Sequence, residues 1–443
     1  MSFQNIYSEK NLINLIILVI PLNYIAGNLM LNLNIIILIF YVFFLFRLEI
    51  FKDKLSIIDK LIIIYFFYIV INGIFNNLFN SSLQNDNTVL FKSLLYTRFL
   101  ILYFVLKYLI KRDLINYKLL FFSFGFYSFF VSFDLIIQYV FGKDLFGYEG
   151  VGRRLAGPFG DEQIAGGFIQ RFFIFIPFSL FFFKNKNWKI QIIFLFVLSI
   201  CILGIMIAGN RMPIILFILS LVMTFVYQKS LRKTLILLPF VIIGAYTYIV
   251  NANINYAYHI KGTLERSSQI YDYAKTKLTT GKVELLNTYI KEIELGILTW
   301  EENKYLGGGV KSFYWTCANI KHSKIIKLKL ELVKRGDKVN CNIHPHNYYI
   351  QILAELGIMG LFLSLFLFIL IFLKAVKKIH FTDSSDEKLM ILIPFFIIFL
   401  TELFPLKTTG NFFTSTNATF LFIIIAFIVG LIEIKKNNYY DKK

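Results

Sequence analysis

Long apolar stretches alternate with shorter polar segments along most of the chain. A helix needs roughly 20 mostly apolar residues to cross about 30 Å of hydrocarbon, and this pattern predicts about twelve such helices. We expect them at residues 11–28, 29–46, 61–78, 93–110, 119–141, 164–183, 190–208, 212–228, 234–250, 348–373, 389–405 and 413–432. The predicted fold class is therefore an all-α polytopic membrane protein.

One polar segment, residues 251–346, is much longer than the connections between the other predicted spans. Within it, Leu, Ile and Tyr recur at helical spacing in residues 263–277 and 282–295, which predicts short amphipathic helices. The expected organisation is residues 1–250 with nine spans, residues 251–346 as one large extracytoplasmic loop, and residues 347–443 with three spans and a cytoplasmic tail.

Lys and Arg concentrate in every second short loop, as in residues 47–60, 107–118, 184–189, 229–233 and 374–388. Cytoplasmic loops retain cations, whereas long loops cross the membrane largely regardless of charge. Both termini are therefore expected in the cytoplasm and the large loop outside. Lys143, Arg153 and Arg154 break the trend, because they fall in a predicted external loop, and this invites a functional interpretation.

The composition excludes an ordinary soluble domain. Hydrophobic residues make up 57% of the chain and charged residues 16%, compared with about 25% charged residues in soluble domains. The mean hydropathy is +0.66. The formal net charge of +19 owes much to the basic cytoplasmic loops. Because the chain shows no nucleic-acid-binding motif, no nucleic-acid partner is predicted.

Ionisable side chains inside predicted spans are costly, so their positions point to function. Six of them fall in the outer parts of their helices, where they could line one polar chamber open to the outer leaflet. The alternative is that each pairs locally or extends to the membrane surface. The six are Arg98, Asp134, Arg171, Arg211, Glu355 and Glu402.

Two predicted external turns carry arginine. Residues 152–162 combine glycine and proline, which permit tight turning, with Arg154 and the carboxylates Asp161 and Glu162. Residues 208–213 form a very short turn that places Arg211 at the mouth of two helices. The planar guanidinium fork suits phosphate oxygens, so both arginines are candidate phosphate ligands. A charged turn and a lipid-headgroup anchor are the simpler alternatives.

The end of the large loop brings two imidazoles to the start of the predicted tenth span. A helix that begins near Asn347 would present its amides and its dipole to an anion at the outer surface. Asn347, Gln351 and Glu355 recur every four residues and form one polar stripe. His346 stands at its top. Since imidazole accepts a proton near neutral pH, we predict His346 as a general base and His344 in a supporting role.

Two of the three cysteines, Cys317 and Cys341, fall in the large loop. An oxidising compartment favours a disulfide between them. The alternative is a metal site shared with His322, His344 and His346, although their spacing matches no standard zinc pattern.

Several of these segments, in this order, resemble the O-antigen ligase and O-antigen polymerase-like membrane glycosyltransferase family. The similar patterns are Arg154 with Gly157-Pro158-Phe159-Gly160, then Gly209-Asn210-Arg211, then Gly307-Gly308-Gly309, then His346-Asn347 with Gly357 and Gly360.

The resemblance implies metal-independent transfer of a glycan, without a cofactor, from undecaprenyl diphosphate to an acceptor glycolipid such as lipid A core. The reaction would occur in a bacterial cytoplasmic (inner) membrane, among membrane lipids, with the active site facing the periplasm. Arg154 and Arg211 would hold the diphosphate, and His346 would activate the acceptor hydroxyl or steady the leaving group. We add Arg171, Asp161 and Glu162 as supporting residues.

Three alternatives stay open. Within the same family the chain could be a polymerase that extends the glycan on its carrier, or an enzyme that transfers the glycan to a protein hydroxyl. From a different class, it could be a flippase for lipid-linked glycans. Transporters more often show internal repeats and compact loops, and neither is evident in the sequence. The large loop next to a histidine favours an enzyme.

Overall fold

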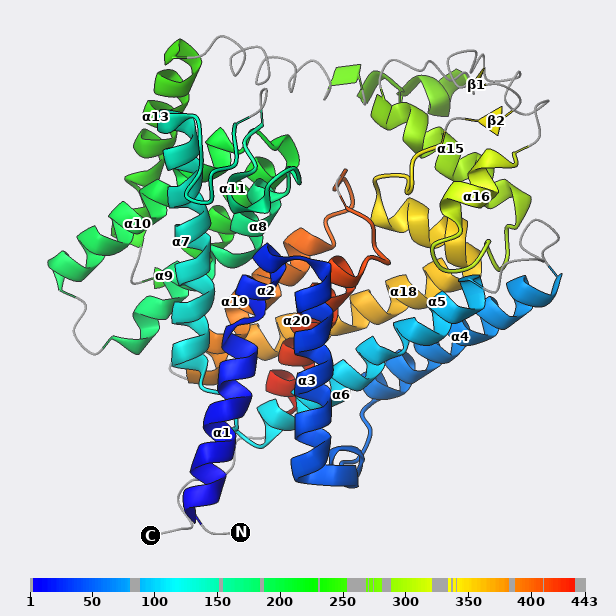
Figure 1. Cartoon of the computed structure of the whole chain (residues 1–443), viewed down its shortest axis with the longest axis horizontal. Coiled ribbons are helices and arrows are strands. Elements are labelled where there is room, and N and C mark those ends of the chain that lie inside the picture. The colour runs from blue at the N-terminus through cyan, green and yellow to red at the C-terminus, as the bar shows by residue number, and fades with distance from the viewer. Residues whose placement is uncertain are drawn as a thin grey trace.

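The computed structural model describes residues 3–79, 88–150, 154–183, 187–229, 232–252, 268–269, 271–273, 275–280, 288–320, 334–335, 338–339, 341–381, 387–408 and 410–434. Within these ranges the chain is a bundle of α-helices with one short antiparallel pair of strands (Figure 1). The prediction of a predominantly helical fold is confirmed.

The helices follow one another closely along the chain. The first part contains α1 (Phe3–Leu18), α2 (Ile20–Ala26), α3 (Asn28–Phe46), the 3-10 helix η1 (Arg47–Phe51), α4 (Ile57–Phe79), α5 (Thr88–Tyr96), α6 (Arg98–Lys111) and α7 (Tyr117–Phe141). The middle part contains η2 (Gly157–Phe159), α8 (Ala165–Phe172), α9 (Phe175–Ser179), η3 (Leu180–Phe182), α10 (Trp188–Ile207), α11 (Arg211–Tyr227), α12 (Arg232–Leu235) and α13 (Leu238–Ala252). The last part contains α15 (Thr288–Glu302), α16 (Phe313–Ala318), β1 (Lys334–Arg335), β2 (Lys338–Val339), α18 (Tyr348–Phe381), α19 (Glu387–Glu402) and α20 (Ser415–Glu433).

Each predicted span contains helix, but several are interrupted. The first bends by 41° between α1 and α2, next to Pro21, because proline lacks the amide hydrogen that a continuous helix needs. The sixth is divided into α8, α9 and η3 ahead of and around Pro177.

The predicted number of twelve spans is not confirmed. Among the described residues, eight helical segments are long and apolar enough to cross a membrane, or nine if the bent pair of α1 and α2 counts as one span. The apolar helix α11 and the apolar part of α13 are shorter than a full span. The sequence pattern located the helices, and the number of them that cross a membrane stays a prediction.

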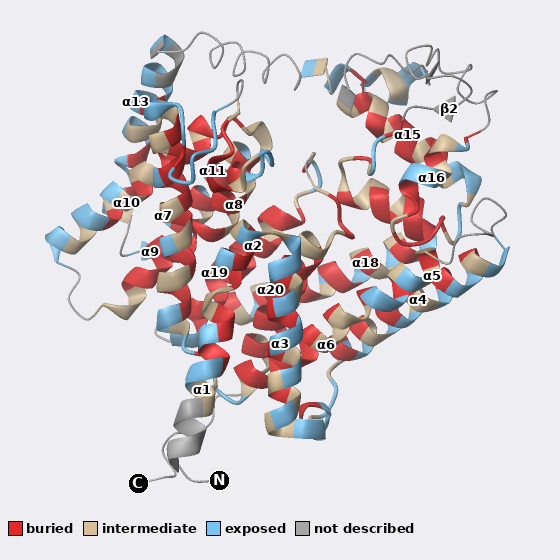
Figure 2. Ribbon diagram, viewed as in Figure 1, coloured by how far each residue is buried: buried red, intermediate tan, exposed pale blue. Residues whose placement is uncertain are grey.

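The core of the bundle surrounds α20, which is buried along nearly its whole length (Figure 2). It packs against α6, α18 and α19. Phenylalanine supplies much of this packing, as in the stacked rings of Phe395 and Phe427, whose centroids lie 4.3 Å apart. The aromatic richness of the chain therefore serves the core as well as the surface.

Buried charges join the helices at the end of the bundle opposite α15 and α16 (Figure 1). Lys107 Nζ lies 2.5 Å from Asp59 Oδ2 and 2.8 Å from Glu433 Oε2, which ties α6 to α4 and α20. The hydroxyl of Tyr103 donates to Asp59 Oδ1 at 2.6 Å. The basic loop residue Lys111 lies at the same end, 2.8 Å from Asp53. Placement of this end in the cytoplasm stays a prediction from the positive-inside rule.

The described part of the large loop packs on the other end of the bundle. Helix α15 lies against α18, and α16 contacts both α15 and α18. The predicted helix at 282–295 corresponds to α15, which begins at Thr288 and continues to Glu302. Much of the predicted helix at 263–277 lies outside the described residues, although 268–269, 271–273 and 275–280 are helical.

Candidate active site

The histidine segment leads directly into α18, and Asn347 closes the first turn of this helix. Asn347 Oδ1 accepts hydrogen bonds from Tyr349 N at 3.0 Å and Ile350 N at 3.2 Å, which is the pattern of an N-cap. Asn347 Nδ2 donates to the carbonyl of Pro405 at 2.9 Å. The helix therefore starts where the sequence predicted, and the loop after α19 is fixed to it.

His344 and His346 are half-buried and flank the buried Pro345. Their rings meet edge to face with centroids 4.3 Å apart. His346 has a φ of 54°, in the left-handed region that residues other than glycine seldom adopt. Burial, assisted by the neighbouring His344, lowers the pKa of His346 to about 4. The imidazole is therefore neutral at pH 7 and has a lone pair available to accept a proton.

The predicted polar stripe exists, but its lower members are fully buried and bonded to protein. Gln351 Nε2 donates to Glu355 Oε1 at 3.0 Å and to Asn411 Oδ1 at 2.8 Å, and Gln351 Oε1 accepts from Phe412 N at 2.8 Å. Glu355 Oε2 accepts from Lys311 N at 2.6 Å. Gln351 and Glu355 thus hold two loops against α18 and support the helix that carries His346.

Helix α18 is broken at Gly357, whose φ is 67°. The carbonyls of residues 354 and 355, which lose their helical partners there, accept from the amides of Gly308 and Gly309 at 3.1 and 2.7 Å. The amides of residues 358 and 359 donate to the carbonyls of residues 304 and 305 at 2.9 and 3.4 Å. Unsatisfied backbone groups are costly in a membrane, and this exchange satisfies them. The glycine segment 307–309 therefore docks the large loop onto α18.

A network of charges centred on Glu402 connects the start of α18 to three other helices. Glu402 Oε1 accepts from Arg171 Nη2 at 2.7 Å, from the Tyr348 hydroxyl at 2.7 Å, and lies 2.8 Å from Lys407 Nζ. Arg171 Nη2 also donates to Asn417 Oδ1 at 2.7 Å. Burial lowers the pKa of Lys407 to about 8, against the opposing effect of Glu402. Arg171 is thus fixed next to the residue that follows the His346-Asn347 pair.

Arg154 begins a turn that is held on α7. Gly157, with a φ of 54°, donates its amide to Gln138 Oε1 at 2.9 Å, and Asp134 Oδ1 accepts from Leu145 N at 2.8 Å. Two polar residues of α7 therefore hold the described parts of this loop on either side of residues 151–153, which lie outside the described ranges. Arg154 is half-buried, and its Nε is buried without a hydrogen-bond partner among the described residues.

Arg211 is the first residue of α11, and the preceding Asn210 rests on the start of α8. Asn210 Nδ2 donates to the carbonyl of Gln163 at 3.1 Å. A Cβ added to Gly166 would lie 3.0 Å from the Asn210 side chain, so the turn and α8 approach closely there. The turn η2, which follows Arg154, also contacts α8. Arg154 and Arg211 therefore belong to turns that share α8 as their support.

Of the supporting residues that we added from the sequence, Arg171 lies in a buried network, whereas Asp161 and Glu162 lie at the surface. Arg171 lies in the last turn of α8, within the Glu402 network. Asp161 and Glu162 are exposed in the turn between η2 and α8. The α8 helix is the element that connects the two arginine turns to the start of α18.

Five of the six ionisable residues of the predicted outer chamber fall into separate local contacts instead of lining one space. Arg171 pairs with Glu402, and Glu355 bonds to Gln351 and to the Lys311 amide. Asp134 accepts from the Leu145 amide, and Arg98 donates to Ser415 Oγ at 2.8 Å. The simpler alternative of local pairing therefore describes Arg98, Asp134, Arg171, Glu355 and Glu402, and it corrects the chamber hypothesis for these five.

Cys317 and Cys341 form a disulfide, which consumes both thiolates that the alternative metal site would require. The bond attaches α16 to the segment just before His344. Next to it, Asn342 Nδ2 donates to Glu292 Oε1 of α15 at 2.7 Å, and burial raises the pKa of this carboxyl group. The segment that leads to His346 is thus anchored on two helices of the large loop.

Sequence reasoning missed Tyr348, Asn411 and Asn417 as parts of this site. Each makes its contact with a residue at least 54 positions away in the chain. Lys407 carried a usable signal, because it is the lone cation in a predicted external loop.

These features define an integral membrane protein of the helical class, with a buried polar network where its large loop meets the bundle. A family model described as O-antigen ligase matches residues 194–365. The match confirms the resemblance: over these residues the chain is similar to the O-antigen ligase-like family, whose members are membrane glycosyltransferase-like enzymes. It includes Arg211, Gly307, His346 and Gly357, whereas Arg154 lies before it. No curated protein matches the chain.

Proposed function

We propose that the protein is an O-antigen ligase-like glycosyltransferase. It transfers a glycan from undecaprenyl diphosphate to a sugar hydroxyl of an acceptor glycolipid such as lipid A core, at the periplasmic face of a bacterial inner membrane. The family match at residues 194–365 supports the class of enzyme. The half-buried His346, placed directly before the N-cap of α18, is the observation that carries the reaction.

In the proposed reaction, the acceptor oxygen bonds to the anomeric carbon of the donor glycan. The bond between that carbon and the diphosphate oxygen breaks, and undecaprenyl diphosphate leaves with the bonding electron pair. The acceptor proton passes to the imidazole of His346. Arg154 and Arg211 stabilise the negative charge that develops on the diphosphate.

The supports of these residues favour a preorganised site. His346 is followed by an N-capped helix, and that helix is fastened by the glycine loop, by Gln351 and by Tyr348. The arginine turns rest on α7 and α8. Catalytic geometry requires groups held by their surroundings, because a misplacement of about 1 Å can cost about 100-fold in rate.

Substitution of the histidine tests the proposal. In H346A, glycan transfer by the purified enzyme should fall by at least about 100-fold, in line with loss of a general base. The matched control is H380A, because His380 is an exposed histidine at the other end of α18. Both variants should reach the membrane at the wild-type level. Full transfer activity in H346A would refute the catalytic role.

Glycan profiling of a deletion strain identifies the kind of transfer. Bare lipid A core with long glycans left on the carrier would support a ligase. Core capped by one repeat unit would instead indicate a polymerase, and glycan trapped on the cytoplasmic side would indicate a flippase. Unchanged lipid A with an unmodified protein acceptor would indicate transfer to protein.

A further inference from the structure

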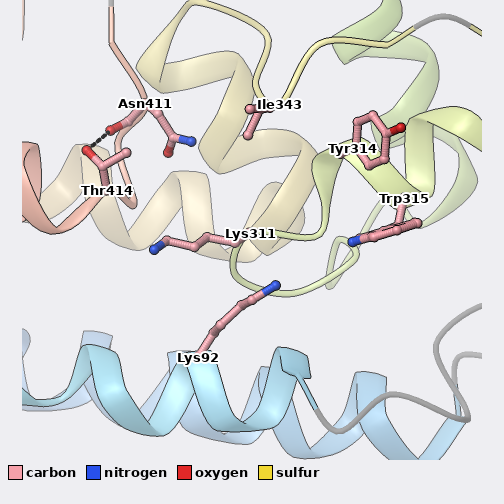
Figure 3. A pocket seen from close by; sticks show the side chains of 7 residues that line it. All are labelled: Lys92, Lys311, Tyr314, Trp315, Ile343, Asn411 and Thr414. Atoms are coloured by element: carbon pink, nitrogen blue, oxygen red, sulfur yellow. Dashed lines mark hydrogen bonds between the residues drawn. The ribbon is translucent and has the colours of Figure 1, made fainter. Parts of the chain in front are cut away.

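A pocket of about 340 Å³ lies beside the docked glycine loop and is lined by cations and aromatic rings (Figure 3). Helix α5 contributes Lys92, the loop that follows the glycines contributes Lys311, and α16 contributes Tyr314 and Trp315. Asn411, from the loop between α19 and α20, closes the opposite side. None of these residues belongs to the arginine turns or to the histidine pair.

The pocket concentrates positive charge. The side chains of Lys92 and Lys311 both extend into it (Figure 3). Within the part of the chain that the structure describes, no carboxylate forms an ion pair with either ammonium group. Arg98 is close enough to Lys311 to act on it electrostatically, and its Nε is buried without a hydrogen-bond partner among the described residues. Burial, with Arg98 and Lys92, lowers the pKa of Lys311 against the opposing effect of the Glu355 carboxylate.

The position of Lys311 is built into the fold. Its φ is 59°, which is unfavourable for a residue with a side chain and is maintained only where surrounding contacts impose it. The contact here is the hydrogen bond of 2.6 Å from Lys311 N to Glu355 Oε2. Glu355 itself is fully buried in α18, just before the break at Gly357. The same docked loop that braces α18 therefore directs Lys311 into the pocket.

The aromatic wall is fixed in the same way. Tyr314 and Trp315 are 42% and 51% exposed, and their rings meet edge to face with centroids 5.0 Å apart. Their helix α16 is held by the disulfide of Cys317. Exposed aromatic faces beside hydrogen-bonding groups bind the C–H faces of sugar rings. An aromatic wall next to two ammonium groups therefore suits a sugar that carries an acidic substituent.

This basic pocket is separate from the predicted diphosphate ligands. Arg154 and Arg211 are supported by α7, α8 and α11, whereas the pocket involves α5 and α16. Figure 1 shows α8 and α11 on one side of α20 and α5 and α16 on the other. Ile343, one residue before His344, lies at the pocket, so this wall adjoins the histidine segment. A second anionic substrate group could thus be bound while the first occupies the arginines.

We propose that Lys92 and Lys311 bind a phosphate or carboxylate group on the acceptor glycan, while Trp315 stacks on the sugar that carries it. The identity of the pocket as an acceptor site rests on the proposed transferase function. The binding chemistry, an acidic sugar held by two ammonium groups and an aromatic ring, rests on the pocket alone.

Equilibrium binding to the full-length protein in phosphatidylcholine nanodiscs tests this assignment. The probes are glucose 6-phosphate, with neutral glucose as its comparison, and farnesyl diphosphate as a mimic of the carrier. In the K92Q/K311Q variant, glucose 6-phosphate binding should weaken at least about tenfold, because charge-assisted hydrogen bonds are lost. Farnesyl diphosphate binding should change less than about twofold, since the arginine turns are intact. R154Q/R211Q should show the reverse pattern.

Matched variants keep the test independent of folding. K304Q removes an exposed lysine of the same large loop and should leave both probes bound as in the wild type. K92R/K311R retains the charges and should retain glucose 6-phosphate binding. W315A should weaken glucose 6-phosphate and leave the thermal midpoint near that of the wild type, because the ring is half-exposed.

Four results would overturn the proposal. The first is that glucose 6-phosphate does not bind the wild type at millimolar concentration, and the second is that it binds K92Q/K311Q as well as the wild type. The third is that K92Q/K311Q loses binding of farnesyl diphosphate but not of glucose 6-phosphate. The fourth is that added phosphatidylglycerol fully displaces glucose 6-phosphate. The third result would assign the pocket to the donor diphosphate, and the fourth would assign it to a lipid headgroup. None depends on His346, so failure of the proposed transferase function would appear separately, as retained transfer in H346A.

Discussion

Replacement of Gly357 by alanine tests whether the broken helix is needed for transfer. The added Cβ would lie 2.2 Å from the Tyr305 carbonyl oxygen and 2.6 Å from Leu306 N, and both are backbone atoms that cannot rotate away. With a φ of 67° and a ψ of −172°, Gly357 lies in a region that is essentially open only to glycine, and a residue with a side chain there costs about 1–3 kcal/mol. Relief of the clash requires the glycine loop to move away from α18.

Movement of the loop breaks the four backbone hydrogen bonds that join residues 304–309 to residues 354–359. Each such bond contributes about 1 kcal/mol net, so together with the backbone cost the docked state loses about 5–7 kcal/mol. A change of about 3 kcal/mol already shifts the ratio of docked to undocked loop by more than about 100-fold, and the transfer rate falls with the docked fraction once the undocked state dominates. We expect G357A to show this loss while the protein stays in the membrane.

The assay combines transfer rate with amide hydrogen exchange of residues 304–312. Exchange should rise in G357A at Gly308, Gly309 and Lys311, because the amides of these residues lose their partners on α18. G244A is the matched control, since Gly244 lies in the apolar helix α13 and a Cβ there meets no atom within 4 Å. Normal transfer together with normal exchange in G357A would refute the reasoning that this backbone junction positions the site.

Three further predictions concern other parts of the site. In the pH profile of kcat/KM, the acid limb should lie near pH 4 rather than near about 6.5. The reason is that His346, with its lowered pKa, stays unprotonated until the pH falls through that pKa. An acid limb near about 6.5 would show that His346 is not in the buried environment described above. E402Q should lower stability by about 3 kcal/mol in thermal unfolding, since it leaves buried cations unpaired, whereas E149Q at an exposed ion pair should change it by less than about 1 kcal/mol. C317S/C341S should weaken glucose 6-phosphate binding at the pocket with little effect on farnesyl diphosphate, and unchanged binding of both probes would show that the disulfide does not fix the aromatic wall.

The sequence predicted those features that depend on residues close together in the chain. The start of α18 follows from Asn347, because an N-cap acts on amides two and three residues ahead. The stripe of Gln351 and Glu355 follows from helical spacing. What these side chains touch did not follow, since Gln351 bonds to residues 60 and 61 positions away. Spacing gives the face of a helix, but only the packing of the bundle gives the partner of that face.

The prediction of an outer polar chamber was wrong for the same reason, because helical spacing does not give the packing partners of a side chain. A charge within an apolar span predicts a polar partner or a polar surrounding. Arg171 and Glu402 confirm this, because they are 231 positions apart in the chain and bonded to each other. The sequence could not show that the cost of burying each charge is offset by the other rather than by solvent. Conversely, Lys92 and Lys311 attracted no attention, because lysines near predicted helix ends and in a long loop are ordinary. Only their meeting at one pocket makes them notable.

The break in α18 explains why glycine, carboxylate and histidine occur together in one stretch of sequence. Without the break, the carbonyls of residues 354 and 355 would be used within the helix, and the large loop would have no backbone acceptors to bind there. With it, docking the loop also brings the Lys311 amide to Glu355. A substitution at Gly307 or Gly357 therefore acts on the histidine segment and on the basic pocket at once, whereas K92Q/K311Q acts on the pocket alone. If the break couples the two sites, K92Q/K311Q should lose acceptor binding at the pocket alone. G357A should lose both acceptor binding and transfer rate.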